Sequence, residues 1–207
     1  MCLHSCLLRN VTVLLLAYVT TGAAQTCLPA WTPTTDAEQV AWDEERAEWA
    51  HYLEQIPAYL VQLPEAPDTA LLMPVEGVAV AEVTDTWGAA RSQGRIHEGQ
   101  DIFAVEGTPV LSATPGFVWR ISERRLGGKT VTVLGAGGMR YYYAHLSEYA
   151  PDLHEGLAVT ADTLLGYVGK TGNAQNTAPH LHLGVSTGDP LRCEREVFDP
   201  LPLLVDR

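Results

Sequence analysis

An amphipathic helix is the first element that the pattern of apolar and polar positions predicts. Over residues 36–56 the bulky apolar side chains fall near one stripe of a helical surface, while acids and arginines fall elsewhere: Trp42, Trp49, Leu53 and Ile56. Thr35 and Glu38 have the spacing of a capping box, in which both side chains bond free backbone N–H groups at the helix start. Pro57 predicts the end of the helix, because proline lacks the N–H that another turn needs.

The stripe of this helix has two interpretations. Trp42 and Trp49 either dock on the rest of the protein or belong to a prosegment or partner-binding helix that covers an active-site groove. Residues 57–74 predict a linker, because prolines recur along them at positions 57, 64, 67 and 74. We therefore expect residues 25–72 to form an N-terminal helix and a proline-rich linker.

From about Met73 the sequence changes to short runs rich in β-branched residues, separated by glycine, proline and aspartate. These runs predict strands at 77–81, 108–112, 117–121, 129–134, 139–145, 157–159, 163–168 and 180–186. The glycine-rich residues 135–138 predict a hairpin turn between two of them. The fold class expected for residues 73–207 is therefore mainly β, with one mainly antiparallel sheet domain.

Composition sets limits on size and partners. The chain has 207 residues, of which 46% are hydrophobic, enough for one core of ordinary size plus appendages. Its formal net charge of −12 indicates against nucleic acid as a partner, because binding to phosphates requires a basic surface.

The first 24 residues predict an export signal. Arg9 provides a positive flank, residues 11–19 provide a short apolar core, and residues 22–24 are small as at a cleavage site. The apolar run is about half of the roughly 20 residues that span a bilayer. Cleavage fits the flanks better than an uncleaved anchor does, and a lipid anchor at Cys27 is a further alternative, although residues 24–26 lack the usual lipoprotein pattern.

After such a cleavage two cysteines remain, Cys27 and Cys193. In an oxidising compartment they form either one disulfide or two separate thiols, because the sequence does not give the distance between them. Neither cysteine has the C-x-x-C spacing of a cysteine zinc site.

The candidate chemistry begins at the triplet His180-Leu181-His182. Side chains alternate faces along a strand, so the two imidazoles share one face and Leu181 points to the other. A metal is the usual partner of two adjacent imidazoles, but the triplet alone is more typical of a pair of solvent-facing histidines on a half-exposed strand.

A second cluster, His97 and Asp101, precedes this triplet in the same predicted sheet. Gly99 lies between them and permits a turn that leads into a strand. Alone, the pair is more typical of a surface turn. From this pair and the H-x-H triplet a site can draw two imidazoles and a carboxylate, a ligand set that zinc accepts with a fourth position left for water.

A third cluster is the run Tyr141 to Leu146. Strict alternation places Tyr141, Tyr143 and His145 on one face, and Tyr142 with Ala144 on the other. By itself, His145 is typical of a hydrogen-bonded structural histidine.

These clusters together resemble the lysostaphin-type or LytM-like zinc metallopeptidases of peptidase family M23. The matching segments occur in the family's order within about residues 73–202: His97-x-Gly99-x-Asp101-Ile102, Glu106-Gly107-Thr108-Pro109-Val110, Tyr143-Ala144-His145-Leu146, Leu165-Gly166-Tyr167-Val168-Gly169-Lys170-Thr171-Gly172 and Pro179-His180-Leu181-His182. Gly184 and residues 173–178 depart from the family pattern, and these departures concern substrate preference.

The resemblance implies a site and an activity. His97, Asp101 and His182 would bind one Zn²⁺, and His145 and His180 would be the catalytic histidines. Tyr143 would be either an extra donor in the site or a packed aromatic. The implied function is an exported endopeptidase of the periplasm, cell envelope or extracellular space that cuts peptide cross-links or stem peptides of peptidoglycan. The alternatives are a non-catalytic LytM-type regulator of a murein amidase and an M23-type peptidase that acts on a protein.

Overall fold

The computed structural model describes residues 35–91, 94–188 and 195–207. The predicted export signal, Cys27 and Cys193 lie outside the described residues, and so do the lipid anchor and the disulfide that those cysteines would form. Within the described ranges, no helix combines the length and apolar character needed to cross a membrane.

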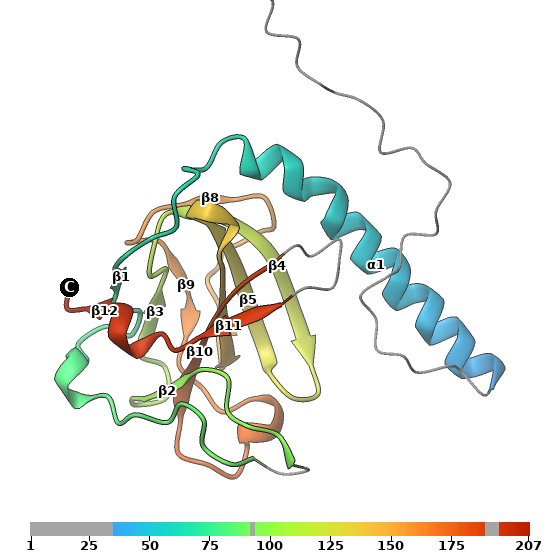
Figure 1. The fold of residues 1–207 in the computed structure, drawn as a ribbon. Helices are drawn as coiled ribbons and strands as arrows, with labels where there is room; N and C mark the ends of the chain where they lie inside the picture. Colours follow the sequence, from blue (N-terminus) through green and yellow to red (C-terminus); the bar gives the residue numbers. More distant parts are fainter. Residues whose placement is uncertain (1–34, 92–93, 189–194) are drawn as a thin grey trace, which may run out of the picture.

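A seven-stranded antiparallel sheet is the centre of the fold (Figure 1). Its strands are β2 (Gln100–Phe103), β4 (Gly116–Arg124), β5 (Gly128–Gly135), β6 (Arg140–Leu146), β8 (Ala158–Val159), β10 (His180–Thr187) and β11 (Glu196–Phe198). The order is β11-β10-β6-β5-β4-β8, with β2 also paired to β10. Strand β10 therefore holds three neighbours: β6 along residues 182–186, β2 along 180–183 and β11 along 185–187.

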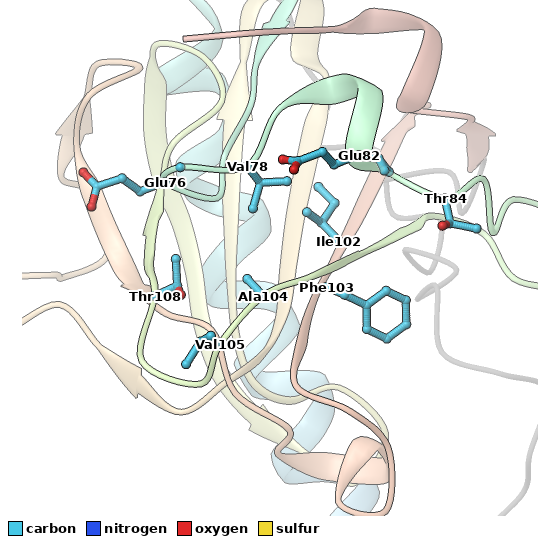
Figure 2. A pocket seen from close by; sticks show the side chains of 11 residues that line it. Glu76, Val78, Glu82, Thr84, Ile102, Phe103, Ala104, Val105 and Thr108 are labelled. Atoms are coloured by element: carbon cyan, nitrogen blue, oxygen red, sulfur yellow. The ribbon is translucent and has the colours of Figure 1, made fainter.

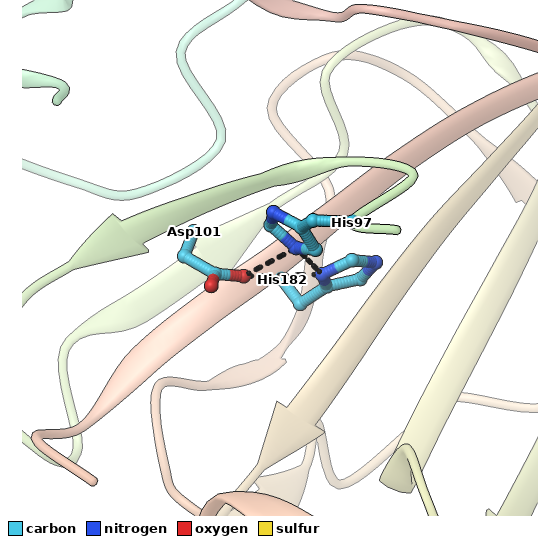
Figure 3. A group of neighbouring side chains, drawn as sticks. All are labelled: His97, Asp101 and His182. Carbon is cyan, nitrogen blue, oxygen red and sulfur yellow. Dashed lines mark hydrogen bonds and ion pairs between the residues drawn. The ribbon is translucent and has the colours of Figure 1, made fainter. Parts of the chain in front are cut away.

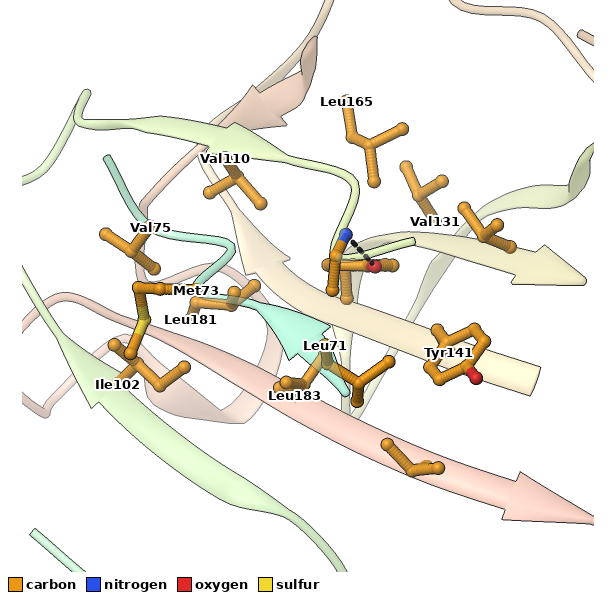
Figure 4. Close-up of a cluster of buried hydrophobic side chains, with 14 of the residues drawn as sticks. Leu71, Met73, Val75, Ile102, Val110, Val131, Tyr141, Leu165, Leu181 and Leu183 are labelled. Carbon is orange, nitrogen blue, oxygen red and sulfur yellow. Dashed lines mark hydrogen bonds between the residues drawn. The ribbon is translucent and has the colours of Figure 1, made fainter. Parts of the chain in front are cut away.

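Two smaller sheets complete the β domain. Strands β3 (Pro109–Leu111), β9 (Leu164–Tyr167) and β7 (Glu148–Tyr149) form one, and β1 (Leu71–Leu72) pairs in parallel with β12 (Leu204–Val205) in the other. Short 3₁₀ turns η1 (Val80–Glu82), η3 (Ala136–Gly138), η4 (Gly172–Ala174) and η5 (Leu201–Leu203) connect the strands. Side chains from all three sheets meet in one buried cluster, which includes Leu71, Val110, Leu165, Leu181 and Leu183 (Figure 4).

The mainly β, antiparallel class is confirmed, and most predicted strands are present. The strand predicted at 77–81 is wrong: Gly77 adopts a left-handed conformation, the N–H of Val78 bonds to the carbonyl of Val75, and η1 follows. Strands β1, β7, β11 and β12 lie where no strand was predicted, and each has only two or three residues.

Helix α1 (Asp36–Leu60) packs with its C-terminal part on the outer face of β4. Tyr52 and Ile56 are buried against Trp119 and Leu134. The backbone carbonyl of Tyr52 accepts a hydrogen bond of 3.2 Å from the Trp119 indole N–H. The docked part of α1 therefore lies on strand β4 and not over the histidine cluster on β10, which favours docking on the rest of the protein among the two interpretations of this helix.

The predicted helix end at Pro57 is also wrong, because α1 continues to Leu60. A proline this close to the end removes a single N–H, and the Pro57 carbonyl still accepts a bond of 3.3 Å from the N–H of Val61. Contacts of Tyr59 support the last turn, since its ring stacks on Phe117 with centroids 4.9 Å apart. The side chains of Trp42 and Trp49 lie outside the described part of the structure, so their docking stays a prediction.

Candidate metal and catalytic site

Three side chains of types that can bind a metal converge where β2 pairs with β10. The register of this pair places Asp101 directly opposite His182. The turn before β2 adds His97, whose Nε2 lies 3.0 Å from Asp101 Oδ1 and 2.8 Å from His182 Nδ1. His182 Nδ1 lies 3.1 Å from the same carboxylate oxygen (Figure 3). The structure thus brings together the three residues that the sequence predicted as ligands.

The donor set fits a small tetrahedral cation. Ligands at about 2.0–2.1 Å in a tetrahedral site are separated by roughly 3.3 Å, so the observed separations of 2.8–3.1 Å lie within about half an ångström of that geometry. His97 donates its Nδ1–H to the carbonyl of Thr86 at 2.7 Å, and the lone pair of Nε2 is left for the metal. Among the described residues, His97, Asp101 and His182 form a group able to hold an ion.

Gly99 is required for close packing around His182. A Cβ on Gly99 would lie 2.7 Å from Cε1 and 2.8 Å from Nε2 of the His182 ring, and 2.6 Å from the carbonyl oxygen of Leu183. The backbone of Gly99 is not in the left-handed region. Its role is therefore to leave space for a ligand ring, and not to provide the unusual turn conformation suggested by the sequence.

His180 lies on the same face of β10 as His182, as alternation predicts. Its Nε2 is 3.8 Å from Asp101 Oδ1, and its Nδ1–H donates to the carbonyl of Ala178 at 2.8 Å. The intervening Leu181 is fully buried in the core below. One face of β10 thus packs in the core, and the opposite face presents two imidazoles to the site.

His145 reaches the site through an irregularity in β6. Its φ of 64° is in the left-handed region, and among the described residues other than glycine it is the one with a positive φ. The pairing of β5 with β6 shifts register between Lys129 and Val131, which places a bulge next to His145. The ring then faces the other two histidines, with its centroid 5.0 Å from that of His180 and 6.0 Å from that of His182.

The bulge corrects the predicted face of His145 relative to the tyrosines. Tyr143 is fully buried, and its hydroxyl accepts a bond of 2.9 Å from the N–H of Ala113, so it is a packed aromatic and not a donor in the site. Tyr142 lies at the site instead, with its ring edge-on to His182 at 6.0 Å between centroids. The extra residue at the bulge moves His145 to the face of Tyr142, which strict alternation had placed opposite.

Burial controls the charges of the site. Burial lowers the pKa of His145 from its ordinary 6.5 to about 4, against a raising effect of its hydrogen bond to Thr171. Burial also lowers the pKa of His182. For Asp101 burial opposes ionisation, but the adjacent rings of His182 and His97 outweigh it and hold the pKa of that carboxyl below its usual range. A neutral imidazole and an ionised carboxylate are the forms that bind metals.

Comparison with known proteins identifies the family. Residues 95–193, which contain all five of these histidine and aspartate side chains, match the family model described as Peptidase family M23. They form a domain of peptidase family M23. An L-Ala–D-Glu endopeptidase of Bacillus subtilis is 39% identical over 126 residues, which are 58% of this chain and 38% of that protein. The chain thus spans well under half the length of this curated relative.

Solved structures share the fold of the M23 domain. A structure from Pseudomonas aeruginosa named as a peptidase M23 has a TM-score of 0.52 and 30% identity, and the alignment covers 75% of this chain and 62% of that one. A LytM from Ruminococcus gnavus, named as a glycyl-glycine endopeptidase, has a TM-score of 0.53 and 27% identity, with 69% and 63% covered. The similarity to lysostaphin-type peptidases deduced from the motifs is confirmed.

The site of the M23 domain opens into a groove of about 550 Å³. Its walls carry three arginines that sequence reasoning did not single out: Arg91, Arg95 and Arg195. Arg91 Nη2 lies 2.5 Å from Asp101 Oδ2, the carboxylate oxygen that faces away from the histidines, and Arg195 pairs with Glu98 at 2.7 Å. These arginines come from loops without a motif, and no sequence signal distinguishes them from other exposed arginines.

A second hollow of about 440 Å³ lies beside β2, between that strand and the segment that contains η1 (Figure 2). The residues that line it include Glu76, Glu82 and Val105, and neither histidine nor cysteine is among them. Phe103 lines both hollows. The imidazoles and the carboxylate thus concentrate in the groove of the M23 domain and not in this second hollow.

Proposed function

We propose that this protein is an exported zinc endopeptidase that hydrolyses peptide bonds of bacterial peptidoglycan. The observation that carries the proposal is the convergence of His97 Nε2, Asp101 Oδ1 and His182 Nδ1 within 3.1 Å of one another at the floor of a groove. Two neutral imidazoles and one carboxylate leave a bound Zn²⁺ with a net positive charge and an open position. The relatives named as L-Ala–D-Glu and glycyl-glycine endopeptidases support the choice of substrate.

The chain's own residues provide the binding and the proton transfers. His97, Asp101 and His182 would hold Zn²⁺, which when bound polarises a peptide carbonyl and lowers the pKa of a coordinated water to about 7. His145 donates its Nδ1–H to the carbonyl of Thr171 at 2.9 Å, so its Nε2 is the ring atom that can accept a proton. His180 is oriented in the same way by the carbonyl of Ala178.

Two histidines with free Nε2 atoms suit the two proton transfers of peptide hydrolysis. One ring takes the proton of the attacking water, and a protonated ring then stabilises the oxyanion or gives the proton to the leaving amine. The 5.0 Å between the ring centroids of His145 and His180 lets both rings act on one peptide bond. A regulator without catalysis would not need this set, and the chain retains every member of it.

Export is part of the proposal because peptidoglycan lies outside the cytoplasm. Its support is the leader-like pattern of residues 1–24, in which a positive flank precedes a short apolar run and a small-residue site.

Removal of the metal tests the zinc requirement. The purified chain is treated with a chelator, and hydrolysis of two peptides, one with an L-Ala–D-Glu bond and one of glycines, is followed by mass spectrometry. We expect hydrolysis of one of them to stop on chelation and to return with one equivalent of Zn²⁺. Hydrolysis at an unchanged rate in the chelated protein would contradict the proposal.

A further inference from the structure

Gln100 is a fully buried amide whose hydrogen-bonding capacity is completely used. Its Nε2 donates to Asp85 Oδ1 at 2.8 Å and to Asp199 Oδ1 at 3.0 Å. Its Oε1 accepts from the Thr86 N–H at 2.9 Å and from the Thr86 hydroxyl at 3.0 Å. A glutamine amide offers two donors and two acceptor positions, and all four are engaged here. This residue lies between two predicted metal ligands and has no role in the site described above.

These four bonds allow one orientation of the amide. In the reverse orientation the NH₂ group would face the N–H of Thr86, and the carbonyl oxygen would face the carboxylates of Asp85 and Asp199. Both contacts are repulsive, and an unsatisfied buried polar group costs about 1–3 kcal/mol. The bond to Gln100 is the main reason that the pKa of Asp85 is lowered, which keeps that acceptor ionised. The two acids therefore fix the direction in which Gln100 presents its oxygen to Thr86.

Thr86, held by Gln100, in turn hydrogen-bonds to two of the metal-binding residues. Its carbonyl accepts the Nδ1–H of His97 at 2.7 Å, and this bond sets which ring nitrogen faces the metal. Its hydroxyl, whose proton goes to Gln100, accepts the backbone N–H of Asp101 at 2.9 Å. One threonine thus holds both His97 and Asp101, and the buried amide holds the threonine by both its N–H and its O–H.

We propose that Gln100 and Thr86 form a positioning pair that pre-sets His97 and Asp101 for the metal. The pair touches neither the metal nor the substrate, and acts through the ligands it orients. Residues that hydrogen-bond to metal ligands in this way contribute roughly 10- to 100-fold to metal affinity. The inference rests on the proposed function, because it takes the three convergent side chains to be a metal site.

The test measures metal binding by spectroscopy, independently of hydrolysis. The full chain is prepared with Thr86→Val, which keeps the shape of the side chain and removes its hydroxyl, and separately with Gln100→Met. Thr86→Ser restores the hydroxyl. Thr114→Val is the matched control, because Thr114 is buried and donates a bond of 2.7 Å to Asp68 away from the site. Co²⁺ is titrated into each metal-free protein, and its visible absorption spectrum and affinity are recorded together with the protein's stability to urea.

We expect Thr86→Val and Gln100→Met to weaken Co²⁺ binding by roughly 10-fold or more and to alter the spectrum of the bound ion. Thr86→Ser should return both toward wild type, and Thr114→Val should lose stability but keep wild-type affinity and spectrum. If Gln100→Met does not fold, the two Thr86 variants alone decide the result. Wild-type affinity and spectrum in Thr86→Val would overturn the positioning pair and leave the metal site standing. Failure of the wild-type chain to bind Co²⁺ would instead contradict the metal site and the proposed function.

Discussion

Three histidines of the site are oriented by the same device at the level of single residues. His97, His145 and His180 each donate the Nδ1–H to a backbone carbonyl, at 2.7, 2.9 and 2.8 Å. A backbone carbonyl can only accept, so each bond fixes the tautomer and leaves Nε2 with its lone pair. The backbone therefore sets which ring nitrogen of these three histidines carries the proton, independently of any metal or substrate.

Two glycines that flank His182 give a prediction with an internal control. Gly99→Ala should weaken metal binding by roughly 10-fold or more, because the new Cβ would lie 2.7 Å from the His182 ring and would also press on the carbonyl of Leu183. Gly184→Ala should leave it nearly unchanged, because a Cβ there meets its nearest atoms at 3.6 Å, an ordinary contact. Calorimetric titration with Zn²⁺ measures both. Equal affinities in the two variants would show that the space at Gly99 is not needed.

The lowered pKa of His145 gives a prediction for stability against pH. The folded pKa is about 4 and the ordinary value is 6.5, so between these values the unfolded chain binds more protons than the folded chain. The stability of the metal-free protein should therefore fall as the pH falls from 6.5 toward 4, by no more than about 3 kcal/mol from this residue.

Urea unfolding of the metal-free chain at several pH values measures this effect. His145→Asn is the comparison, because asparagine tolerates the left-handed backbone and does not titrate in this range. The difference in unfolding free energy between wild type and this variant should shrink on acidification through that window. A difference that is constant from pH 7 to about pH 4 would contradict burial as the cause of the shift.

The sequence predicted which histidines and which aspartate meet in the site better than it predicted the residues that surround and orient them. Period-two alternation was enough to place His180 and His182 on one face, because β10 is regular there. It failed for His145, which it placed on the face of Tyr143, because the bulge there depends on a positive φ that no residue type in that run indicates. Gln100 and Thr86 were not found either, since their contacts join segments that only the folded chain brings together.

At the level of elements, β10 is the strand on which the site depends. It pairs with β2 and β6, which carry Asp101 and His145, and its own residues provide His180 and His182. Its other face is anchored by Leu181 and Leu183, both fully buried. A strand fixed by core packing on one side holds its polar side chains in place on the other, which is the rigidity that a metal site requires.

Helix α1 should stabilise the protein without taking part in catalysis. Ile56→Ala should lower the free energy of unfolding by about 2 kcal/mol or more, because Ile56 is 4% exposed and packs with Tyr52, Trp119 and Leu134. Val40→Ala on the same helix is the control, since Val40 is 58% exposed and should change it by less than about 0.5 kcal/mol. Peptide hydrolysis under stable conditions should be the same in both. Faster or slower hydrolysis in Ile56→Ala alone would show that the helix acts on the groove.

Among the elements, long strands were predictable and short ones were not. Strands β4, β5, β6 and β10 have seven to nine residues, enough for a β-branched pattern to stand out. Strand β1 has two residues and exists because its partner β12 lies beside it, more than 130 positions away along the chain. The extension of α1 past Pro57 likewise depends on the contact of Tyr59 with Phe117, which only the tertiary structure provides.

At the level of the whole molecule, the groove contrasts with the rest of the protein in charge. The chain carries a formal net charge of −12, yet three arginines and two carboxylates among the groove residues give a net of +1 there before any metal charge is added. A groove of this sign attracts acidic peptides across an otherwise repulsive surface.

This contrast predicts the salt dependence of substrate choice. A stem peptide with a free carboxylate on its D-Glu residue should have a kcat/KM that drops about threefold or more between about 20 and about 200 mM salt, because salt screens attraction between exposed charges. The same peptide with that carboxyl amidated should change less. The measurement is kcat/KM for the two peptides at each salt concentration. An equal decrease for both peptides would contradict a role for the groove charge.

Digestion of purified cross-linked peptidoglycan by the zinc-loaded chain tests the proposed endopeptidase activity on its full substrate. Products are identified by mass spectrometry, with zinc-treated His182→Ala, which lacks one of the three convergent ligands, run beside the wild type. The wild-type protein should hydrolyse peptide bonds in the cross-links or the stem peptides, and new peptide products should appear. The variant should yield none. Intact peptidoglycan after incubation with a wild-type protein shown to contain zinc, or equal cleavage by His182→Ala, would contradict the account.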